Sequence, residues 1–151
     1  MPAPPLAVVI LNWKRPHDTV ACLRSLQRVE VPWRGIVVDN ASGDDSVKVI
    51  RAAFPEVELL VSPRNLGFAG GNNLGLRRAL EAGFSYILLL NNDATVEPSA
   101  PGLLLDAAAA NTRAGILSPL IRYAQSGRVW FAGSYRRRLW PGVTMPAYRR
   151  Y

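Results

Sequence analysis

Only one cysteine, Cys22, and one histidine, His17, occur in this chain of 151 residues. A single thiol excludes an internal disulfide framework and a cysteine-based zinc site. A single imidazole excludes a histidine-rich metal centre and argues against a Ser–His–Asp hydrolase. The N-terminus has no basic stretch ahead of a long apolar run, so it predicts neither a secretion signal nor a membrane-spanning helix. These scarcities favour a reducing, cytoplasmic setting.

Acidic residues are absent from the C-terminal end. Residues 1–106 carry 10 basic and 11 acidic side chains, whereas residues 107–151 carry 8 arginines and no acid, so the net charge of +7 arises entirely there. Most of these arginines lie in two runs: Arg136, Arg137 and Arg138, then Arg149 and Arg150. Such asymmetry is typical of a solvated tail or of a surface that meets an anionic partner. RNA binding would explain the charge but none of the motifs below, so no nucleic-acid partner is expected.

The apolar segments indicate the fold class. Hydrophobic residues make up 49% of the chain and charged residues 19%, which allows one domain with a real core. Short apolar runs predict strands at residues 6–11, 36–38, 57–61, 86–90, 116–121 and 129–132. Pro16 and Asp18 open one predicted helix, with Val20, Leu23 and Leu26 on one face. Further helices are predicted from Asp44 or Asp45 to before Pro55, over residues 69–82 and over residues 98–110. This alternation predicts an α/β fold, with a mostly parallel sheet and helices on both faces.

Three polar motifs follow apolar runs directly. The first, residues 37–42, contains Asp39; the second, residues 65–73, is rich in glycine and asparagine; the third, residues 90–93, ends in Asp93. In a chain of alternating strands and helices, residues just past the strand ends converge on one crevice. An acid, a glycine-rich turn and a second acid would then share one site. That set suits a nucleoside diphosphate held with a divalent metal ion.

Each motif also has a purely structural explanation. Asp39 either accepts hydrogen bonds from a base or ribose, or caps a turn. The glycines let the backbone approach a ligand, or they pack closely on the sheet. Asp93 either binds a hard divalent cation or caps the next helix. The second motif has neither a Gly-x-Gly-x-x-Gly spacing nor a phosphate-loop lysine, which disfavours dinucleotide enzymes and P-loop NTPases.

In combination, the motifs resemble glycosyltransferase family two and, within it, the bacterial rhamnosyltransferase-like branch. The resemblance extends from residue 6 to about residue 135. It rests on Val8-Val9-Ile10-Leu11-Asn12-Trp13, Val38-Asp39-Asn40-Ala41-Ser42, Asn65-Leu66-Gly67, Asn73, Gly75, Asn91-Asn92-Asp93 and Val129-Trp130-Phe131-Ala132-Gly133. The combination is specific to the family but does not identify the sugar.

The resemblance implies a GT-A-type fold whose C-terminal half is truncated here. Residues 1–122 would form a nucleotide-sugar-binding α/β domain, and residues 123–151 would start an acceptor-side region that is irregular or partly disordered. The implied reaction transfers a sugar such as rhamnose, with inversion, from a nucleoside-diphosphate sugar to a cell-surface polysaccharide or glycolipid. The glycan or lipid-linked acceptor and the basic end together imply peripheral contact with the inner face of the plasma membrane.

The resemblance also implies roles for individual residues. Asp93 would bind Mg²⁺ or Mn²⁺ against the diphosphate. The nucleotide-binding residues would be Leu11, Asn12, Asp39, Asn65, Gly67, Gly71, Asn72, Asn91 and Asn92. Two positions depart from the common family pattern: Asn91 replaces the first acid of the Asp-x-Asp motif, and Asn72 replaces an arginine that many relatives have. Both read as features of the branch.

The general base has no candidate among the C-terminal residues. An inverting transferase needs a carboxylate to take the proton of the acceptor hydroxyl, and the family places it in the second half. No Asp or Glu follows Asp106, so the base is expected to lie outside this chain. The chain is then either the donor-binding portion of a longer enzyme or a nucleotide-sugar-binding module without catalytic activity of its own.

Overall fold

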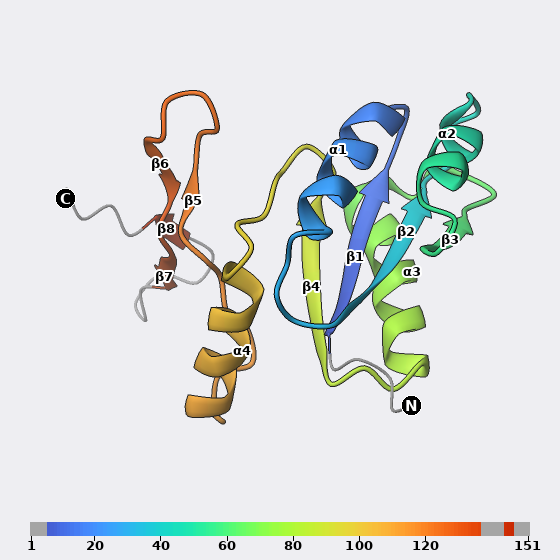
Figure 1. Ribbon diagram of the computed structural model, residues 1–151. Coiled ribbons are helices and arrows are strands. Elements are labelled where there is room, and N and C mark those ends of the chain that lie inside the picture. The colour runs from blue at the N-terminus through green and yellow to red at the C-terminus, as the bar shows by residue number, and fades with distance from the viewer. Residues whose placement is uncertain (1–5, 137–143, 147–151) are drawn as a thin grey trace. The chain divides into compact units, whose positions relative to one another are not determined.

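The first unit of the protein is a parallel sheet covered by helices (Figure 1). The computed structural model describes residues 6–136 and 144–146, and it divides into two units between Gly102 and Leu103. The strands of the first unit are β1 (Leu6–Asn12), β2 (Trp33–Asp39), β3 (Glu58–Val61) and β4 (Tyr86–Asn91). Its helices are α1 (Pro16–Leu26), α2 (Ser46–Ala53) and α3 (Gly67–Glu81), and α4 (Ala100–Ala110) begins at its end.

Strand β1 lies inside the sheet and aligns the strand ends. The order is β3-β2-β1-β4, and β1 pairs in parallel with both β2 and β4. Its residues from Ala7 to Ile10 are completely buried, as a continuous apolar run predicts. In this register Asn12 lies opposite Asp39, and Leu11 lies opposite Asn91. The residues at the carboxyl ends of the three strands therefore lie at the same edge of the sheet.

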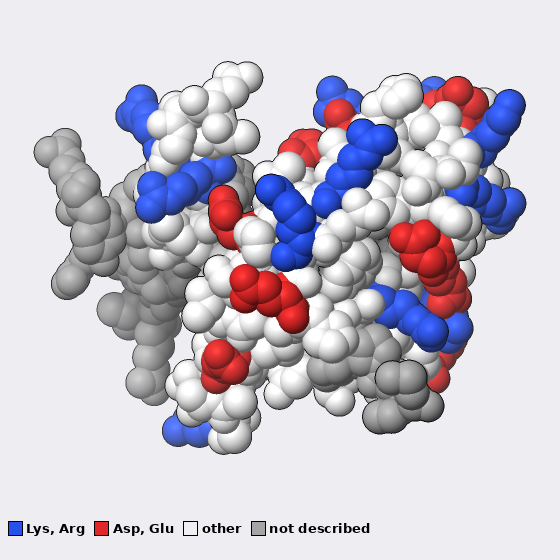
Figure 2. Space-filling model, viewed as in Figure 1, with Lys and Arg blue, Asp and Glu red and all other residues white. Residues whose placement is uncertain are grey.

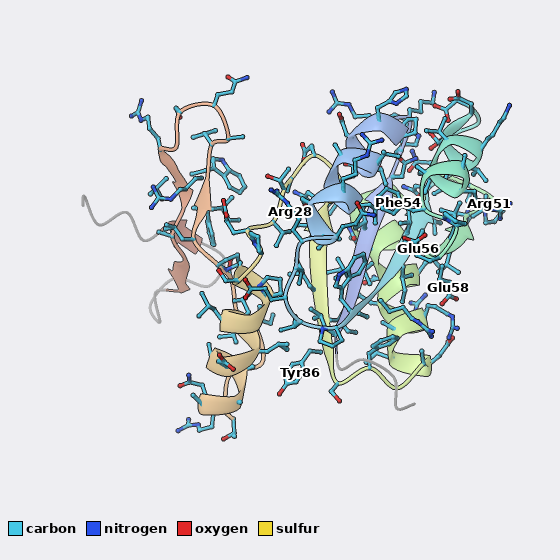
Figure 3. All side chains as sticks on the ribbon, in the orientation of Figure 1. Arg28, Arg51, Phe54, Glu56, Glu58 and Tyr86 are labelled. Carbon is cyan, nitrogen blue, oxygen red and sulfur yellow. The ribbon has the colours of Figure 1, made fainter. Side chains whose placement is uncertain are left out.

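The two faces of the sheet pack against different helices. Side chains alternate along β1, so Val8 and Ile10 face α1 and α2, whereas Ala7 and Val9 face α3. The first cluster includes Phe54, which is labelled in Figure 3 and only 3% exposed. Burying each large apolar side chain stabilises the fold by roughly 1.5–3 kcal/mol. The predicted arrangement of helices on both faces is confirmed.

Charged side chains of the first unit lie mostly at its surface. Figure 2 shows basic and acidic groups interspersed over the visible face of this unit. One ion pair joins two elements: the Arg78 guanidinium on α3 donates to the Glu58 carboxylate on β3, which is labelled in Figure 3. The Arg78 side chain is 39% exposed and the Glu58 side chain is 34% exposed, so this ion pair adds little to stability.

The second unit contains short antiparallel strand pairs. Strand β5 (Ile121–Arg122) pairs with β6 (Val129–Phe131), and β7 (Ser134–Arg136) pairs with β8 (Thr144–Pro146). The predicted strand at residues 116–121 is wrong except for its last residue. Pro119 interrupts that segment and has no N–H to donate to a ladder.

The predicted helices differ from the observed ones only at their ends. Helix α4 begins at Ala100 rather than at residue 98, and α3 begins at Gly67 rather than at residue 69. The boundary between a nucleotide-sugar domain and an acceptor-side region at residues 122 and 123 stays a prediction. Short strands occur between residues 123 and 136, and the remainder of that predicted region lies largely outside the described residues. Within the described ranges, no helix combines the length and hydropathy that a membrane span needs.

Replacing Gly75 by alanine is expected to destabilise the first unit. A Cβ atom at Gly75 would lie 2.3 Å from Val9 Cγ1 and 3.2 Å from Val38 Cγ2, both in the packed sheet. We expect a net loss of roughly 2 kcal/mol, after subtracting a helix-propensity gain of about 1 kcal/mol. Chemical denaturation measures it. The control is Asn73→Ala, an exposed change on the same helix; an unchanged midpoint for Gly75→Ala would contradict this packing role.

Candidate functional site

A buried hydrogen-bond network occupies the carboxyl ends of β1 and β2. Asn12 Nδ2 donates to Asp39 Oδ1 over 2.8 Å and to Ser42 Oγ over 3.2 Å. The Ser42 hydroxyl donates to Asp39 Oδ1 over 2.6 Å, and its backbone N–H donates to Asp39 Oδ2 over 3.1 Å. Asn12, Asp39 and Ser42 are each at most 4% exposed. The Asp39 carboxylate is therefore held rigidly, and Oδ2 keeps one further lone pair for a ligand.

The second motif is attached to the first through Asn40. Asn40 Nδ2 donates to Asn65 Oδ1 over 3.0 Å and to the Gly67 carbonyl over 3.2 Å, while Asn40 Oδ1 accepts from the Leu66 N–H over 2.9 Å. Asn65 Oδ1 also accepts from the Gly67 N–H over 2.8 Å. Gly67 has a φ of +69°, a conformation that favours glycine at this turn. The predicted neighbours Asn65 and Gly67 thus lie beside the loop that follows Asp39.

Three other predicted nucleotide-binding residues lie on β1 and α3: Leu11 on the strand, and Gly71 and Asn72 on the helix. Gly71 is buried, and a Cβ there would lie 2.4 Å from Leu11 Cδ1 and 3.3 Å from Asn40 Cγ. Asn72 is 6% exposed, and its Nδ2 donates to the Phe68 carbonyl over 2.9 Å. The glycine therefore allows close packing of α3, as the structural explanation of this motif expects. The nucleotide-binding roles of Leu11, Gly71 and Asn72 stay predictions.

The third motif forms a turn that packs against α1. The Asn91 carbonyl accepts from Cys22 Sγ over 3.6 Å, and Asn92 Nδ2 donates to Thr19 Oγ1 over 3.1 Å. Asp93 is exposed, and its carboxylate has no hydrogen bond or ion pair with any other described residue. Helix α4 begins only at Ala100, so Asp93 is not its N-cap. The capping alternative is thereby removed for Asp93.

A small open pocket of about 100 Å³ lies between α1 and this turn. Its lining residues are Asp18, Ala21, Cys22, Asn92, Asp93, Ala94 and Thr95. Burial, helped by the charge of Asp93, raises the pKa of the Cys22 thiol to about 12. Hard divalent cations prefer oxygen ligands to sulfur, so Cys22 suits such an ion less well than Asp93 does. Asp18 is already paired with Arg15 at 3.4 Å.

Asp93 is the carboxylate of this pocket that has no ion pair, and a site with so few carboxylates suits a limited class of ion. No group of three or more His, Cys, Asp or Glu side chains with metal-binding geometry occurs among the described residues. A metal that takes all its ligands from protein does not fit. Mg²⁺ or Mn²⁺ fits better, because such hard cations accept one carboxylate together with substrate phosphates and water. Asp93 is the residue that would hold the ion.

Sequence reasoning missed three residues of this site. Asn40 and Ser42 belong to the first motif, but their connecting roles appear only in the hydrogen bonds described above. Thr19 lies on α1 and is completely buried, and it links Asn92 to Asn12. A threonine inside an amphipathic helix carries no sequence signal for such a role.

Trp13, just after β1, is 50% exposed, and the Lys14 ammonium lies 5.4 Å from its ring centroid.

Solved structures similar to this chain include glycosyltransferases. S. aureus TarS 1-349, solved in complex with UDP-GlcNAc, has a TM-score of 0.56 and 23% identity, over 71% of this chain and 31% of TarS. Mannosyltransferase PcManGT from Pyrobaculum calidifontis, solved with GDP-Man and Mn²⁺, has a TM-score of 0.59 and 18% identity, over 71% of this chain and 33% of PcManGT. The predicted GT-A fold is confirmed.

The chain belongs to glycosyl transferase family 2, whose family model matches residues 7–149. Galactofuranosyltransferase GlfT1 of Mycobacterium tuberculosis is 32% identical over 116 residues, which are 75% of this chain and 38% of GlfT1. The N-acetylglucosaminyl-diphospho-decaprenol L-rhamnosyltransferase of the same organism is 33% identical over 101 residues, 62% of this chain and 33% of that enzyme. The family resemblance, with its rhamnosyltransferase-like relatives, is confirmed. The chain spans less than half the length of these relatives.

Proposed function

We propose that this chain is the donor-binding portion of a glycosyltransferase, which holds a nucleoside-diphosphate sugar together with Mg²⁺ or Mn²⁺. The observation that carries the proposal is the contrast between the two acids at the sheet edge. Asp39 is buried and fixed by hydrogen bonds, whereas Asp93 is exposed and its carboxylate makes no hydrogen bond or ion pair with a described residue. A fixed acceptor suits selective contact with a nucleoside, and a free carboxylate suits a hydrated cation.

The similar proteins support a nucleotide-sugar donor without defining it. One fold neighbour was solved with UDP-GlcNAc and the other with GDP-Man and Mn²⁺, so this fold accepts different bases and sugars. One relative is named as an L-rhamnosyltransferase acting on N-acetylglucosaminyl-diphospho-decaprenol. We infer a donor such as a nucleoside-diphosphate rhamnose and a glycolipid or polysaccharide acceptor for the longer protein, with inversion at the transferred carbon.

The residues of this chain would act mainly by binding and orientation. Asp39 Oδ2 would accept a hydrogen bond from the base or ribose, and the exposed Trp13 ring offers a face for stacking a base. Asp93 would hold the cation against the diphosphate. When bound, that ion supplies Lewis-acid stabilisation of the charge that develops on the departing nucleoside diphosphate. Proton removal from the acceptor would come from a carboxylate outside this chain.

A second candidate is a nucleotide-sugar-binding module that transfers no sugar. The observation that favours it is the lack of any Asp or Glu among residues 107–151, where a family-type base would be sought. Donor binding is common to both candidates, whereas sugar transfer is not. Assays of the two properties on the same preparation therefore separate them.

Calorimetry with UDP, GDP and dTDP tests the shared part of the proposal. We expect one of these diphosphates to bind in the presence of Mn²⁺ and to bind more weakly when EDTA removes the metal. Inorganic diphosphate with Mn²⁺ is the control for binding that ignores the nucleoside. If none of the three nucleoside diphosphates binds with or without metal, the proposed function is wrong.

Peripheral membrane contact is a further part of the proposal. It rests on the eight arginines of residues 107–151, of which Arg137, Arg138, Arg149 and Arg150 lie outside the described residues. Each basic residue near an anionic leaflet contributes about 1 kcal/mol, so we expect weak co-sedimentation with vesicles that contain anionic lipid. Raising the salt concentration should release the protein. Equal binding to neutral vesicles, or none at low salt, would contradict an electrostatic contact.

A further inference from the structure

One buried hydroxyl connects the two acidic motifs. Thr19 lies on α1 and is completely buried. Its Oγ1 accepts a hydrogen bond from Asn92 Nδ2 over 3.1 Å and donates one to Asn12 Oδ1 over 2.8 Å. Asn12 Nδ2 in turn donates to Asp39 Oδ1 over 2.8 Å. Four side chains therefore form a continuous chain of hydrogen bonds from the turn that contains Asp93 to the Asp39 carboxylate.

The chemistry of these groups fixes the direction of each bond. An amide nitrogen can only donate, so the hydroxyl of Thr19 accepts from Asn92 and turns its own proton toward Asn12. The alternative acceptor, the Arg15 carbonyl, is farther away at 3.2 Å. Once Asn12 Oδ1 accepts that proton, its Nδ2 must face Asp39. The opposite amide orientation would place an amide oxygen against the carboxylate, which is repulsive.

We propose that Thr19 is a positioning residue that couples the metal-holding turn, residues 91–93, to the nucleoside-holding carboxylate of Asp39. The inference rests on the proposed function, because it assumes a cation at Asp93 and a nucleoside at Asp39. Cation binding orders the turn and fixes Asn92; Asn92 then fixes the Thr19 hydroxyl, and through Asn12 the orientation of Asp39. Burial keeps water from replacing the bonds that join Thr19, Asn12 and Asp39, and hydrogen bonds in series strengthen one another in such surroundings.

Ser25 provides a matched comparison on the same helix. Its Oγ accepts from the Val96 N–H over 3.1 Å and donates to the Cys22 carbonyl over 2.7 Å, and its side chain is 5% exposed. Ser25 therefore also attaches α1 to the segment that follows β4. It has no hydrogen bond to Asn12 or Asp39. Removing the Ser25 hydroxyl loosens the same segment without interrupting the chain from Asn92 to Asp39.

The experiment uses a nucleoside that lacks phosphates. Mg²⁺ cannot bridge such a ligand, so any effect of Mg²⁺ on nucleoside affinity must pass through the protein. Uridine, guanosine or thymidine is chosen to match the nucleoside diphosphate that the wild-type chain binds, and its dissociation constant is measured by NMR titration with and without Mg²⁺. For the wild type we expect Mg²⁺ to tighten nucleoside binding by about fivefold or more.

The variants separate coupling from simple stability. Thr19→Val keeps the shape but lacks the hydroxyl, so the Mg²⁺ effect on nucleoside affinity should disappear; Thr19→Ser should restore it. Ser25→Ala should lower the melting temperature yet keep the effect. Asn92→Ala interrupts the chain at its partly exposed end and should also abolish the effect, which keeps the test valid if Thr19→Val does not fold.

The outcomes distinguish this inference from the function on which it rests. If no nucleoside diphosphate binds to the wild type, the proposed function fails and the coupling fails with it. If the diphosphate binds but Mg²⁺ leaves wild-type nucleoside affinity unchanged, only the coupling is wrong. The coupling through Thr19 is also wrong if Thr19→Val or Asn92→Ala retains the wild-type Mg²⁺ effect.

Discussion

Replacing Asp93 by alanine is expected to abolish the metal dependence of nucleoside-diphosphate binding. Asp93 is the carboxylate of the described pocket that has no hydrogen bond or ion pair, so its oxygens are free to bind a cation. Without it, the added affinity that Mn²⁺ gives should fall by about tenfold or more, a change of at least about 1.4 kcal/mol. Calorimetry with and without EDTA measures this. The melting temperature should stay the same, because no bond within the protein is lost.

A second acid in the same pocket serves as the control. Asp18 also lines the pocket, but its Oδ2 lies 3.4 Å from Arg15 Nε, so Asp18→Ala should change the metal dependence much less than Asp93→Ala does. The metal assignment is wrong if the Asp93 variant keeps the wild-type response to Mn²⁺. A large fall in melting temperature would instead indicate that Asp93 has a structural role in the turn.

Replacing Asp39 by asparagine is expected to weaken both nucleoside binding and the fold. The charge-assisted acceptance of a ligand proton is worth about 1.5–3 kcal/mol, so the dissociation constant of the nucleoside diphosphate should rise by about ten- to a hundredfold. The structure adds a stability cost. Oδ1 accepts from Asn12, and Oδ2 accepts from the Ser42 N–H, so either orientation of an amide at this position places a donor against a donor. Unpaired buried donors cost about 1–3 kcal/mol.

Binding and stability must therefore be measured on the same sample. Calorimetry is run well below the melting temperature of the variant, so that its unfolded fraction is negligible. Asp45→Asn is the matched control, because Asp45 is an exposed acid at the start of α2 without a side-chain capping bond. If Asp39→Asn binds the diphosphate as tightly as the wild type, Asp39 does not contact the nucleoside.

The fold was largely predictable because its signals are local and strong. The apolar run in β1 is continuous, as expected for a strand buried on both faces, and Pro16 stands at the first position of α1. Prediction failed at residues 116–120, where an apolar run without a partner strand stays irregular and Ile116 is 93% exposed. Apolar character there indicated burial, but a strand also needs a neighbour to pair with.

The candidate site was predictable as a location but not as a network. Asp39 and Asp93 lie just at or past their strand ends, so the topology of a parallel sheet places them at one edge. Their different surroundings were not predictable, because burial of Asp39 depends on partners far apart in the sequence. Thr19 is separated from Asn92 by 73 positions, and Asn12 is separated from Asp39 by 27. Only the folded chain brings these side chains into hydrogen-bond distance.

The thiol of Cys22 can serve as a built-in probe of the local separation of α1 from the turn after β4. Cys22 is 1% exposed, its Sγ contacts the Asn91 carbonyl, and its pKa of about 12 keeps it protonated at neutral pH. An alkylating reagent should therefore modify it only in molecules where α1 has moved away from the turn after β4. Since the sequence has no other cysteine, the mass shift of the intact protein over time reports local opening at this single position, without any engineered label.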